Sequence, residues 1–254
     1  MSQWIVKGLQ TGVKTTRYPA EGDDAAGMSP GFPVARKSSQ EGARMLADLC
    51  PTSALVPNEG QVEVNLRRCV HCFRCVRGAD DPMGWNEGYE WAVTRDVSAP
   101  ALGSAFDRSI HILVVDAGDC GACLNEVKQL DNPYYNIHRL GFFITPTPRL
   151  ADILLVVGPV TDHMRLPLQK AYDAMPTPKC VVAVGACALS GGVFGPSFVS
   201  GAGVVGLIPV DVEVPGNPPP PMAILHALLV ATARKPSSTL WSMVAARRET
   251  EPPR

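Results

Sequence analysis

The sequence predicts an α/β protein in which a doubly wound, mostly parallel sheet follows a smaller α+β domain. Two observations support this prediction. Residues 107–254 alternate continuous apolar runs with segments of helical spacing, whereas residues 1–106 are rich in Gly, Pro and charge and contain few such runs. Strands that are apolar along their whole length are buried on both faces, as they are in a parallel sheet between two layers of helices.

The first domain is expected to contain few regular elements. A short helix is predicted over residues 40–49, and it stops there because Pro51 disfavours helical backbone in the residue before it. Residues 61–66 alternate between apolar and polar side chains, which predicts a strand. Residues 77–106 show no clear period and read as a loop with short strands.

The second domain reads as alternating strands and helices. Strands are predicted at residues 109–118, 139–145, 151–158, 179–187 and 206–216. Helices are predicted at residues 120–130 and 163–175, and from the proline run at 218–221 to residue 234. This order predicts a flavodoxin-like, doubly wound sheet, and the last four residues are expected to be disordered.

Composition and charge exclude several classes of protein. The 254 residues include 23 Lys and Arg against 24 Asp and Glu, whereas a general nucleic-acid binder needs a strong basic excess. The longest apolar runs are about half of the ~20 residues that a membrane-spanning helix requires, and the first ten residues lack the apolar core of a secretory signal. We therefore expect a soluble, cytoplasmic chain whose eight cysteines serve metal binding or redox chemistry rather than disulfides.

Four cysteines predict an iron–sulfur site in the first domain. Cys69, Cys72 and Cys75 have the spacing of the first three ligands in a bacterial ferredoxin run, whose own fourth position holds Ala79 here. Cys50 precedes a proline, as the remaining ligand of such a cluster does. These four thiolates predict a [4Fe–4S] cluster. A structural zinc is the alternative, because four-thiolate zinc sites also use Cys-x2-Cys pairs.

The run that ends at Cys50 has lost its other ligands. Counting back from Cys50, the positions that would ligate a second ferredoxin cluster hold Gln40, Ala43 and Leu46. One of the two clusters of a ferredoxin is therefore absent, and the predicted helix takes its place. The first domain is accordingly expected to be a degenerate ferredoxin-like domain.

Three further cysteines predict a second cluster beside the sheet. Ligands of an open parallel sheet collect outside the carboxyl ends of its strands. Cys120 and Cys123 follow the first strand of the second domain, and Cys187 follows the strand residues 181–184. The three thiols should therefore converge on one edge, where thiolates bind iron–sulfur clusters or zinc.

The fourth ligand of this second site is in question. It is expected in the sequence VPGNPPPP after the last strand, where the available residue is Asn217, and an amide is a poor ligand for iron. Cys180 does not replace it, because seven strand residues at ~3.3 Å each would put it about 23 Å from Cys187. Three outcomes remain open: a cubane with one unusual oxygen or nitrogen ligand, a three-iron cluster, or no cluster.

Four collinear motifs then resemble a known family. They are DCGACLNEV, TPRLADILLVVGPVT, MPTPKCVVAVGACALSGGVF and IPVDVEVPGNPPPP. Residues 108–234 resemble the small, electron-transferring subunit of group 4 energy-converting [NiFe] hydrogenases, including formate hydrogenlyase, and the quinone-proximal iron–sulfur subunit of respiratory complex I. In the first domain, GLQTGVKTTRYP, CPTSAL and CVHCFRC resemble the ferredoxin-like subunit of the same complexes. The chain thus resembles a fusion of two neighbouring subunits.

The resemblance implies roles for two more residues. An acid at the position of Glu126 faces the large subunit in these hydrogenases and relays protons, although an ordinary helical glutamate is the simpler interpretation. Arg149 matches an arginine near the cluster in complex I relatives, where a cation would raise the reduction potential. Helix capping or a surface position is equally compatible with Arg149.

The resemblance also implies partners and a location. We expect an electron-transfer iron–sulfur subunit without catalytic residues of its own, bound to a hydrogenase-like large subunit and to membrane subunits on the inner face of the cytoplasmic membrane. Ferredoxin or a dehydrogenase subunit would exchange electrons with it. Two alternatives stay open: an iron–sulfur subunit of a nickel-free complex I-like oxidoreductase, and a structural adapter that holds zinc and has lost the second cluster.

Overall fold

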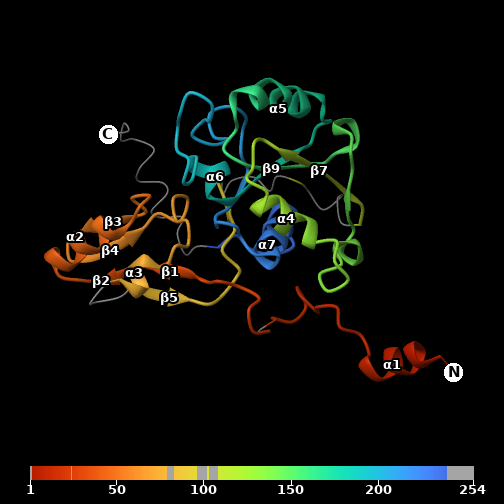
Figure 1. The fold of residues 1–254 in the computed structure, drawn as a ribbon. Helices are drawn as coiled ribbons and strands as arrows, with labels where there is room; N and C mark the ends of the chain where they lie inside the picture. Colours follow the sequence, from red (N-terminus) through yellow and green to blue (C-terminus); the bar gives the residue numbers. More distant parts are fainter. Residues whose placement is uncertain (1, 24, 79–82, 96–101, 103–107, 239–254) are drawn as a thin grey trace.

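A computed structural model describes residues 2–23, 25–78, 83–95, 102 and 108–238 (Figure 1). Its centre is a six-stranded sheet in the order β6-β11-β10-β9-β7-β8. The strands, in that order, are Val93–Thr94, Val212–Val214, Cys180–Val184, Ile153–Val157, Ile110–Asp116 and Phe142–Ile144. Five of them are parallel to one another, and β6 pairs antiparallel to β11 at one edge. The mostly parallel sheet predicted from the apolar runs is therefore confirmed.

Helices cover both faces of this sheet. The helices α4 (Ala122–Gln129) and α7 (Pro221–Ala231) pack on one face (Figure 1). The helices α5 (Asp162–Ala174) and α6 (Gly185–Ser190) pack on the other. Every residue of α7 is buried, because the first half of the chain covers the side that faces away from the sheet.

The first half of the chain forms smaller elements around the predicted helix. A three-stranded antiparallel sheet has the order β2-β4-β3, and β1 pairs antiparallel with β5. These strands, from β1 to β5, are Phe32–Val34, Arg36–Lys37, Leu55–Asn58, Gln61–Val64 and Gly84–Asn86. The helices are α1 (Gln3–Thr11), α2 (Gln40–Leu49) and α3 (Arg74–Arg77). The predicted helix over 40–49 and the strand near 61–66 are thus confirmed.

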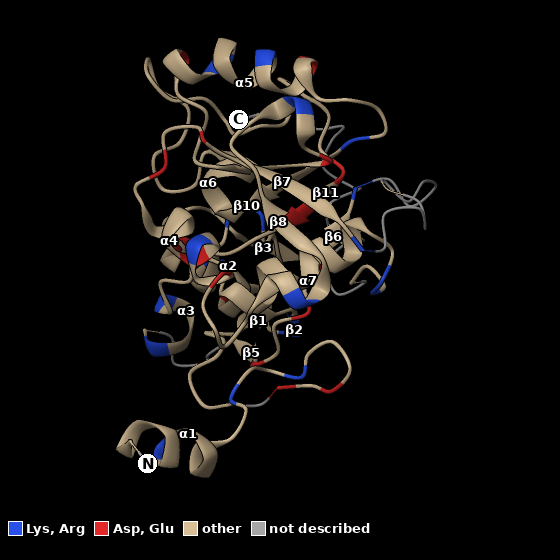
Figure 2. Ribbon diagram, turned by 90° about the vertical axis from the view of Figure 1, so that its right-hand side faces the viewer, with Lys and Arg blue, Asp and Glu red and all other residues tan. Residues whose placement is uncertain are grey.

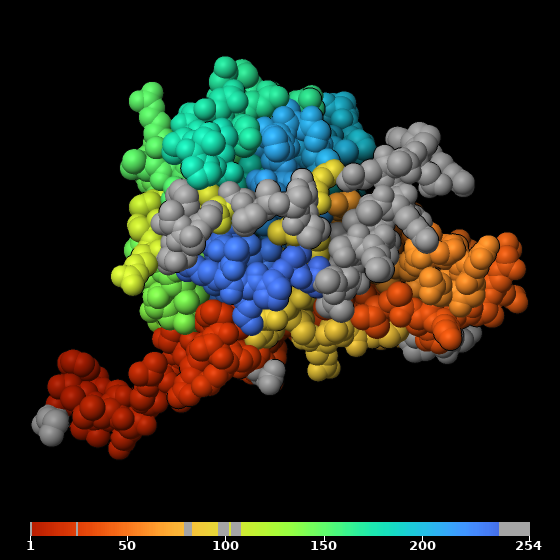
Figure 3. All heavy atoms as spheres, turned by 180° about the vertical axis from the view of Figure 1, so that it is seen from behind, coloured from red at the N-terminus to blue at the C-terminus, as the bar shows by residue number. Residues whose placement is uncertain are grey.

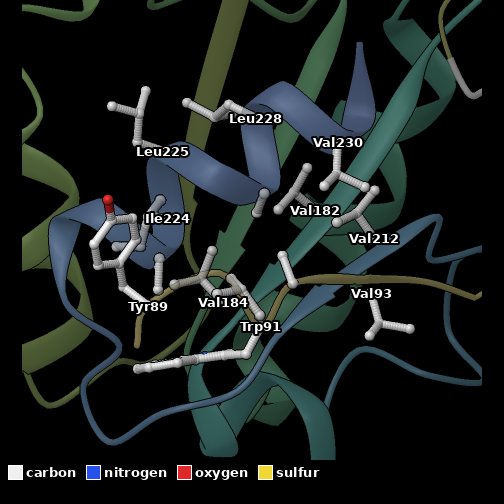
Figure 4. Close-up of a cluster of buried hydrophobic side chains, with 14 of the residues drawn as sticks. Tyr89, Trp91, Val93, Val182, Val184, Val212, Ile224, Leu225, Leu228 and Val230 are labelled. Atoms are coloured by element: carbon white, nitrogen blue, oxygen red, sulfur yellow. The ribbon is translucent and has the colours of Figure 1, made fainter. Parts of the chain in front are cut away.

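One hydrophobic core joins the two halves. Trp91 and Tyr89, from the loop before β6, pack against Ile224 of α7 and Val184 of β10 (Figure 4). The indole N–H of Trp91 donates to the carbonyl of Pro215 at 2.7 Å. Since β6 also extends the main sheet, residues that the sequence assigns to the first domain complete the second, and the division at residue 106 stays a prediction.

The strand predicted over 179–187 is wrong at its carboxyl end. β10 stops at Val184, and Gly185 begins α6 with a φ of +86°, a backbone conformation that glycine adopts at no steric cost. Cys187 is therefore helical, and seven strand residues do not separate it from Cys180. Cys180 still lies at the amino end of β10, away from the edge where Cys187 lies. The tail expected to be disordered lies outside the described residues.

Two features concern the surface. Helix α1 has no buried residue and projects away from the rest of the chain (Figure 3). Lys and Arg are mixed with Asp and Glu on α5, and basic residues occupy α3 (Figure 2).

Within the described part of the chain, no helix is both long enough and apolar enough to cross a membrane.

Candidate metal centres

The structure brings the four cysteines of the first predicted site to one cavity. Cys50 ends α2, Cys69 and Cys72 lie in the loop that follows β4, and Cys75 lies on α3. All four line the cavity, together with apolar walls from Val70, Phe73 and Trp85 among others. Their juxtaposition follows from local sequence, since two-residue spacings turn three thiols of one loop toward the same space.

The loop of the first site adopts left-handed backbone at two residues. His71 has a φ of +50° and Phe73 a φ of +60°, values that L-residues rarely adopt. With this backbone conformation the loop hydrogen-bonds to sulfur, because the backbone N–H of His71 donates to Cys69. On the other wall, the Ala54 N–H donates to Cys50 Sγ at 3.2 Å. N–H groups aimed at thiolates stabilise the negative charge of a metal–sulfur site.

The electrostatics of the first site favour a bound cation. The pKa of Cys69 is raised to about 12, mainly by burial and in addition by the nearby thiols of Cys75, Cys50 and Cys72, because thiolates repel one another. A bound metal would neutralise this negative charge, because cysteine binds metal as the thiolate. The residues present therefore fit the predicted cluster. Cys72 is exposed while the other three are partly buried, so the site opens to solvent at one sulfur.

The three cysteines of the second predicted site also come together. Cys120 precedes α4, Cys123 lies in its first turn, and Cys187 lies on α6. Burial raises the pKa of Cys123, and the charges of Asp119, Cys187 and Cys120 add to this increase. Thiols from two distant segments therefore share one space at the carboxyl edge of β7 and β10, as parallel-sheet geometry predicts.

Glycines leave room around these sulfurs. A Cβ on Gly185 would lie 2.6 Å from Cys123 Sγ, and a Cβ on Gly192 would lie 2.7 Å from Cys187 Sγ. Both distances are shorter than real side chains permit. The two glycines therefore leave space beside each thiol, and the residues around the second site fit a bound group in that space. In the described ranges, however, no three His, Cys, Asp or Glu side chains are grouped to hold a single metal ion.

Asn217 lies at the expected place but its amide turns toward the first site. It follows β11 in the loop that leads to α7, and the neighbouring Gly216 carbonyl accepts from the Ala186 N–H beside Cys187. The side-chain Nδ2 of Asn217 donates to the carbonyl of Val70 at 3.5 Å. Val70 follows Cys69, so the loops of the two sites are in contact.

The two other predicted site residues lie in different places. Glu126, on α4, lines a cavity with His71 and Asn217, and burial raises the pKa of its carboxyl. Arg149 is exposed in a short 3-10 helix, η3 (Pro148–Leu150), that precedes β9. The strand register places η3 at the amino end of the sheet, so the structure does not bring Arg149 together with the cysteines.

One side chain near the second site is absent from the sequence prediction. Asp119 precedes Cys120, and its Oδ2 accepts from the N–H groups of Gly121 and Leu124 at 2.9 and 3.0 Å. An Asp before a helical segment is a recognisable capping signal. Its Oδ1 is buried and has no hydrogen-bond partner among the described residues, which no sequence signal indicates.

Comparisons with known proteins cover the second site. Residues 120–231 match the family model described as NADH ubiquinone oxidoreductase, 20 Kd subunit. The chain is 48% identical over 122 residues to an uncharacterized protein of Methanocaldococcus jannaschii, covering 48% of this chain and 82% of that protein. The four cysteines of the first site precede the residues matched to the family model.

Two similar proteins have functional names. The chain is 43% identical over 124 residues to the probable membrane-bound hydrogenase subunit mbhJ of Pyrococcus furiosus, covering 49% of this chain and 74% of that protein. It is 40% identical over 124 residues to formate hydrogenlyase subunit 7 of Escherichia coli. The latter match covers 49% of each chain, so the present chain spans about half of that relative.

Proposed function

Because the chain belongs to the family described as NADH ubiquinone oxidoreductase, 20 Kd subunit, we propose that it is an electron-transfer iron–sulfur subunit of a membrane-associated, complex I-like [NiFe] hydrogenase. The relatives named as hydrogenase and formate hydrogenlyase subunits support this assignment. The subunit would relay electrons between a redox partner and a catalytic large subunit and would not itself catalyse hydrogen chemistry. Its clusters, when bound, supply reversible one-electron transfer.

Each site would hold one cluster. Cys50, Cys69, Cys72 and Cys75 would ligate a [4Fe–4S] cluster at the first site, and Cys120, Cys123 and Cys187 would supply three ligands at the second. At the first site, the N–H donors to sulfur offset thiolate charge, and the rings of Phe73 and Trp85, with centroids 4.6 Å apart, limit the entry of water.

The contact between Asn217 and Val70 is the observation that best supports electron transfer between the two sites. Val70 lies between two ligand-bearing residues of the first site, and Asn217 lies in the loop that borders the second. The loops that border the two sets of thiols are therefore in direct contact. An electron that enters at the exposed Cys72 would thus have a short path through protein to the second site.

An exposed apolar loop supports a partner at the second site. The backbone N–H of Val193 donates to Cys187 Sγ, so this loop begins at the site itself. Val193, Phe194 and Phe198 are exposed, by 62%, 58% and 91%. Clustered exposed apolar side chains mark protein interfaces, and we assign this one to the large subunit. Membrane subunits would then hold the chain at the inner face of the cytoplasmic membrane, while ferredoxin or a dehydrogenase subunit exchanges electrons at the first site.

Glu126 is the proposed proton-handling residue. Burial raises the pKa of its carboxyl, so it retains a proton closer to neutral pH than a solvated glutamate does. It lines a cavity that also reaches Asn217, beside the second site. A carboxyl at this place could pass protons toward a docked large subunit.

The proposal is tested by purifying the native complex without oxygen and assaying its metals. We expect a brown chain with about eight irons, whose visible absorption bleaches with dithionite, beside a partner that contains nickel. About four irons would leave the second site without a cluster. A colourless chain that contains only zinc would overturn electron transfer in favour of a structural adapter.

Nickel content separates the proposal from a second candidate. The matched family is described by NADH ubiquinone oxidoreductase, which favours a nickel-free complex I-like oxidoreductase acting on quinone or another acceptor. An iron-rich chain whose large partner lacks nickel and does not oxidise hydrogen would establish this second function. The present chain would bind the same iron–sulfur clusters in both cases.

A further inference from the structure

The second site has three thiols and needs one more ligand to hold four irons. The side chain at the expected position, Asn217, is uncharged, and its amide nitrogen is directed to the Val70 carbonyl. An amide oxygen is a weaker donor to iron than an anion is. Another side chain in the same space would therefore compete with Asn217 for the fourth iron.

Asp119 has an unused acceptor in this space. Its Oδ2 accepts two backbone hydrogen bonds at the start of α4, which fixes the orientation of the carboxylate. Its Oδ1 is buried and, within the part of the chain that the structure describes, has no hydrogen-bond partner. An unpaired buried carboxylate oxygen costs free energy, so such an atom requires an explanation, and a bound cation is one.

The hydrogen bonds of Asp119 place its carboxylate beside the residues of the second site. Its Oδ2 accepts from the N–H groups of Gly121 and Leu124, which directly follow Cys120 and Cys123. A carboxylate next to two thiols is destabilised while all three groups are anionic. Iron bound between them would turn this repulsion into attraction.

We propose that Asp119, through Oδ1, is the fourth protein ligand of the second cluster, and that Asn217 is not a ligand. The inference rests on the proposed second cluster. Carboxylates bind iron in proteins, and one carboxylate carries the same charge as the thiolate that the site lacks. The total ligand charge of the second site therefore equals that of a four-thiolate site, whereas ligation by Asn217 would make it one unit less negative.

The test uses Asp119→Asn in the full chain, purified anaerobically within its complex. The amide retains an oxygen that can accept from Gly121 and Leu124, so the start of α4 stays capped while the anionic ligand is lost. We expect iron to fall from about eight per chain to about seven or about four, with the first cluster unchanged by electron paramagnetic resonance. An unchanged iron content and an unchanged Mössbauer spectrum would overturn the proposal.

Two further variants control the experiment. Asp116 lies three residues earlier in the same turn, and its Oδ1 accepts from the N–H groups of Gly118 and Asp119, so Asp116→Asn makes the same chemical change without removing the proposed ligand. We expect Asp116→Asn and Asn217→Ala both to retain about eight irons. Loss of iron in Asn217→Ala together with retention in Asp119→Asn would identify Asn217 as the ligand instead.

The unmodified chain provides a readout that does not depend on folding of a variant. Its Mössbauer spectrum should contain one iron of the second cluster that differs from the other three, because oxygen replaces sulfur there. Four irons with all-thiolate parameters would overturn the proposal. If the unmodified chain contains only about four irons, the second site holds no cluster and this inference is wrong. Electron transfer through the first site would still be supported in that case.

Discussion

Arg67 and Glu213 form a two-point ion pair between the loop of the first site and the main sheet. Arg67 Nε lies 2.7 Å from one carboxylate oxygen of Glu213, and Nη2 lies 3.0 Å from the other. Glu213 is on β11 (Figure 2), where its side chain is only 1% exposed, and Arg95 approaches it at 3.5 Å. Because Arg67 lies two residues before Cys69, the pair fixes the first site to the strand that leads to Asn217.

Glu213→Gln should therefore destabilise the fold. The amide has the same size but removes the carboxylate charge that pairs with the guanidinium groups of Arg67 and Arg95 in a largely buried place. We expect a loss of about 3 kcal/mol in the free energy of unfolding, at the lower end for broken buried pairs because both arginines retain some contact with water. Urea unfolding followed by circular dichroism measures this.

Glu63→Gln is the matched control for that variant. The Glu63 carboxylate accepts from the side-chain amides of Asn58 and Gln61 at the surface, so its loss should cost below about 1 kcal/mol. If both variants lose the same free energy of unfolding, the Arg67–Glu213 pair contributes no more to stability than the surface interactions of Glu63 do.

The sheet is predictable from the sequence because its signal is local. All five residues of β9 are buried and apolar, and its predicted segment needs no knowledge of its neighbours. β6 is different: two residues suffice for it only because β11 offers an edge to pair with. Such pairing depends on tertiary structure, so the sequence predicts only a loop with short strands over this segment and does not place any of these strands in the main sheet.

The same distinction applies to the candidate sites. The spacings of Cys69, Cys72 and Cys75 and of Cys120 and Cys123 are local, and the parallel-sheet rule adds Cys187. Asp119 is not predictable in this way, because its backbone packs against the end of a strand that is distant in sequence. Gly158 follows β9, and a Cβ there would lie 2.6 Å from the Asp119 nitrogen, so the lack of a side chain permits this approach.

Cys50→Ser should remove the first cluster alone. A serine oxygen is a much poorer ligand for iron than a thiolate, and Cys50 lines the cavity of the first site. We expect the iron content to fall from about eight to about four per chain. Cys180→Ser provides the control, because Cys180 is buried on β10 with its thiol near Asp211, and iron should be unchanged. Loss of iron in both variants would refute the assigned ligands.

Gly185→Ala should empty the second site by crowding. The added Cβ would lie 2.6 Å from Cys123 Sγ, so the sulfur must move, and we expect about four irons to be lost per chain. Gly121→Ala separates this effect from backbone strain, since its φ is also positive, at +94°, but its Cβ would meet open space. Gly121→Ala should lower stability by about 1–3 kcal/mol and retain its iron. Matching iron losses would instead implicate strain.

His226 should make stability depend on pH in a predictable direction. It is 1% exposed on α7, and its Nδ1 accepts from the Ala92 N–H at 3.2 Å. Burial lowers the pKa of His226 below its ordinary 6.5. As the pH falls below 6.5, the unfolded chain therefore binds a proton that the folded chain does not. Stability from this residue is complete above pH 6.5 and decreases toward the lower, folded-state pKa.

The measurement compares the free energy of unfolding between pH 5.5 and 8 in the unmodified chain and in His226→Asn. The asparagine oxygen can accept from the Ala92 N–H, but it does not titrate. A single group contributes a slope of at most about 1.4 kcal/mol per pH unit. In the variant, the free energy of unfolding should decrease less on the acid side, and its dependence on pH above 7 should be unchanged. Two parallel curves over the whole range would mean that His226 takes up its proton equally in the folded and unfolded chains.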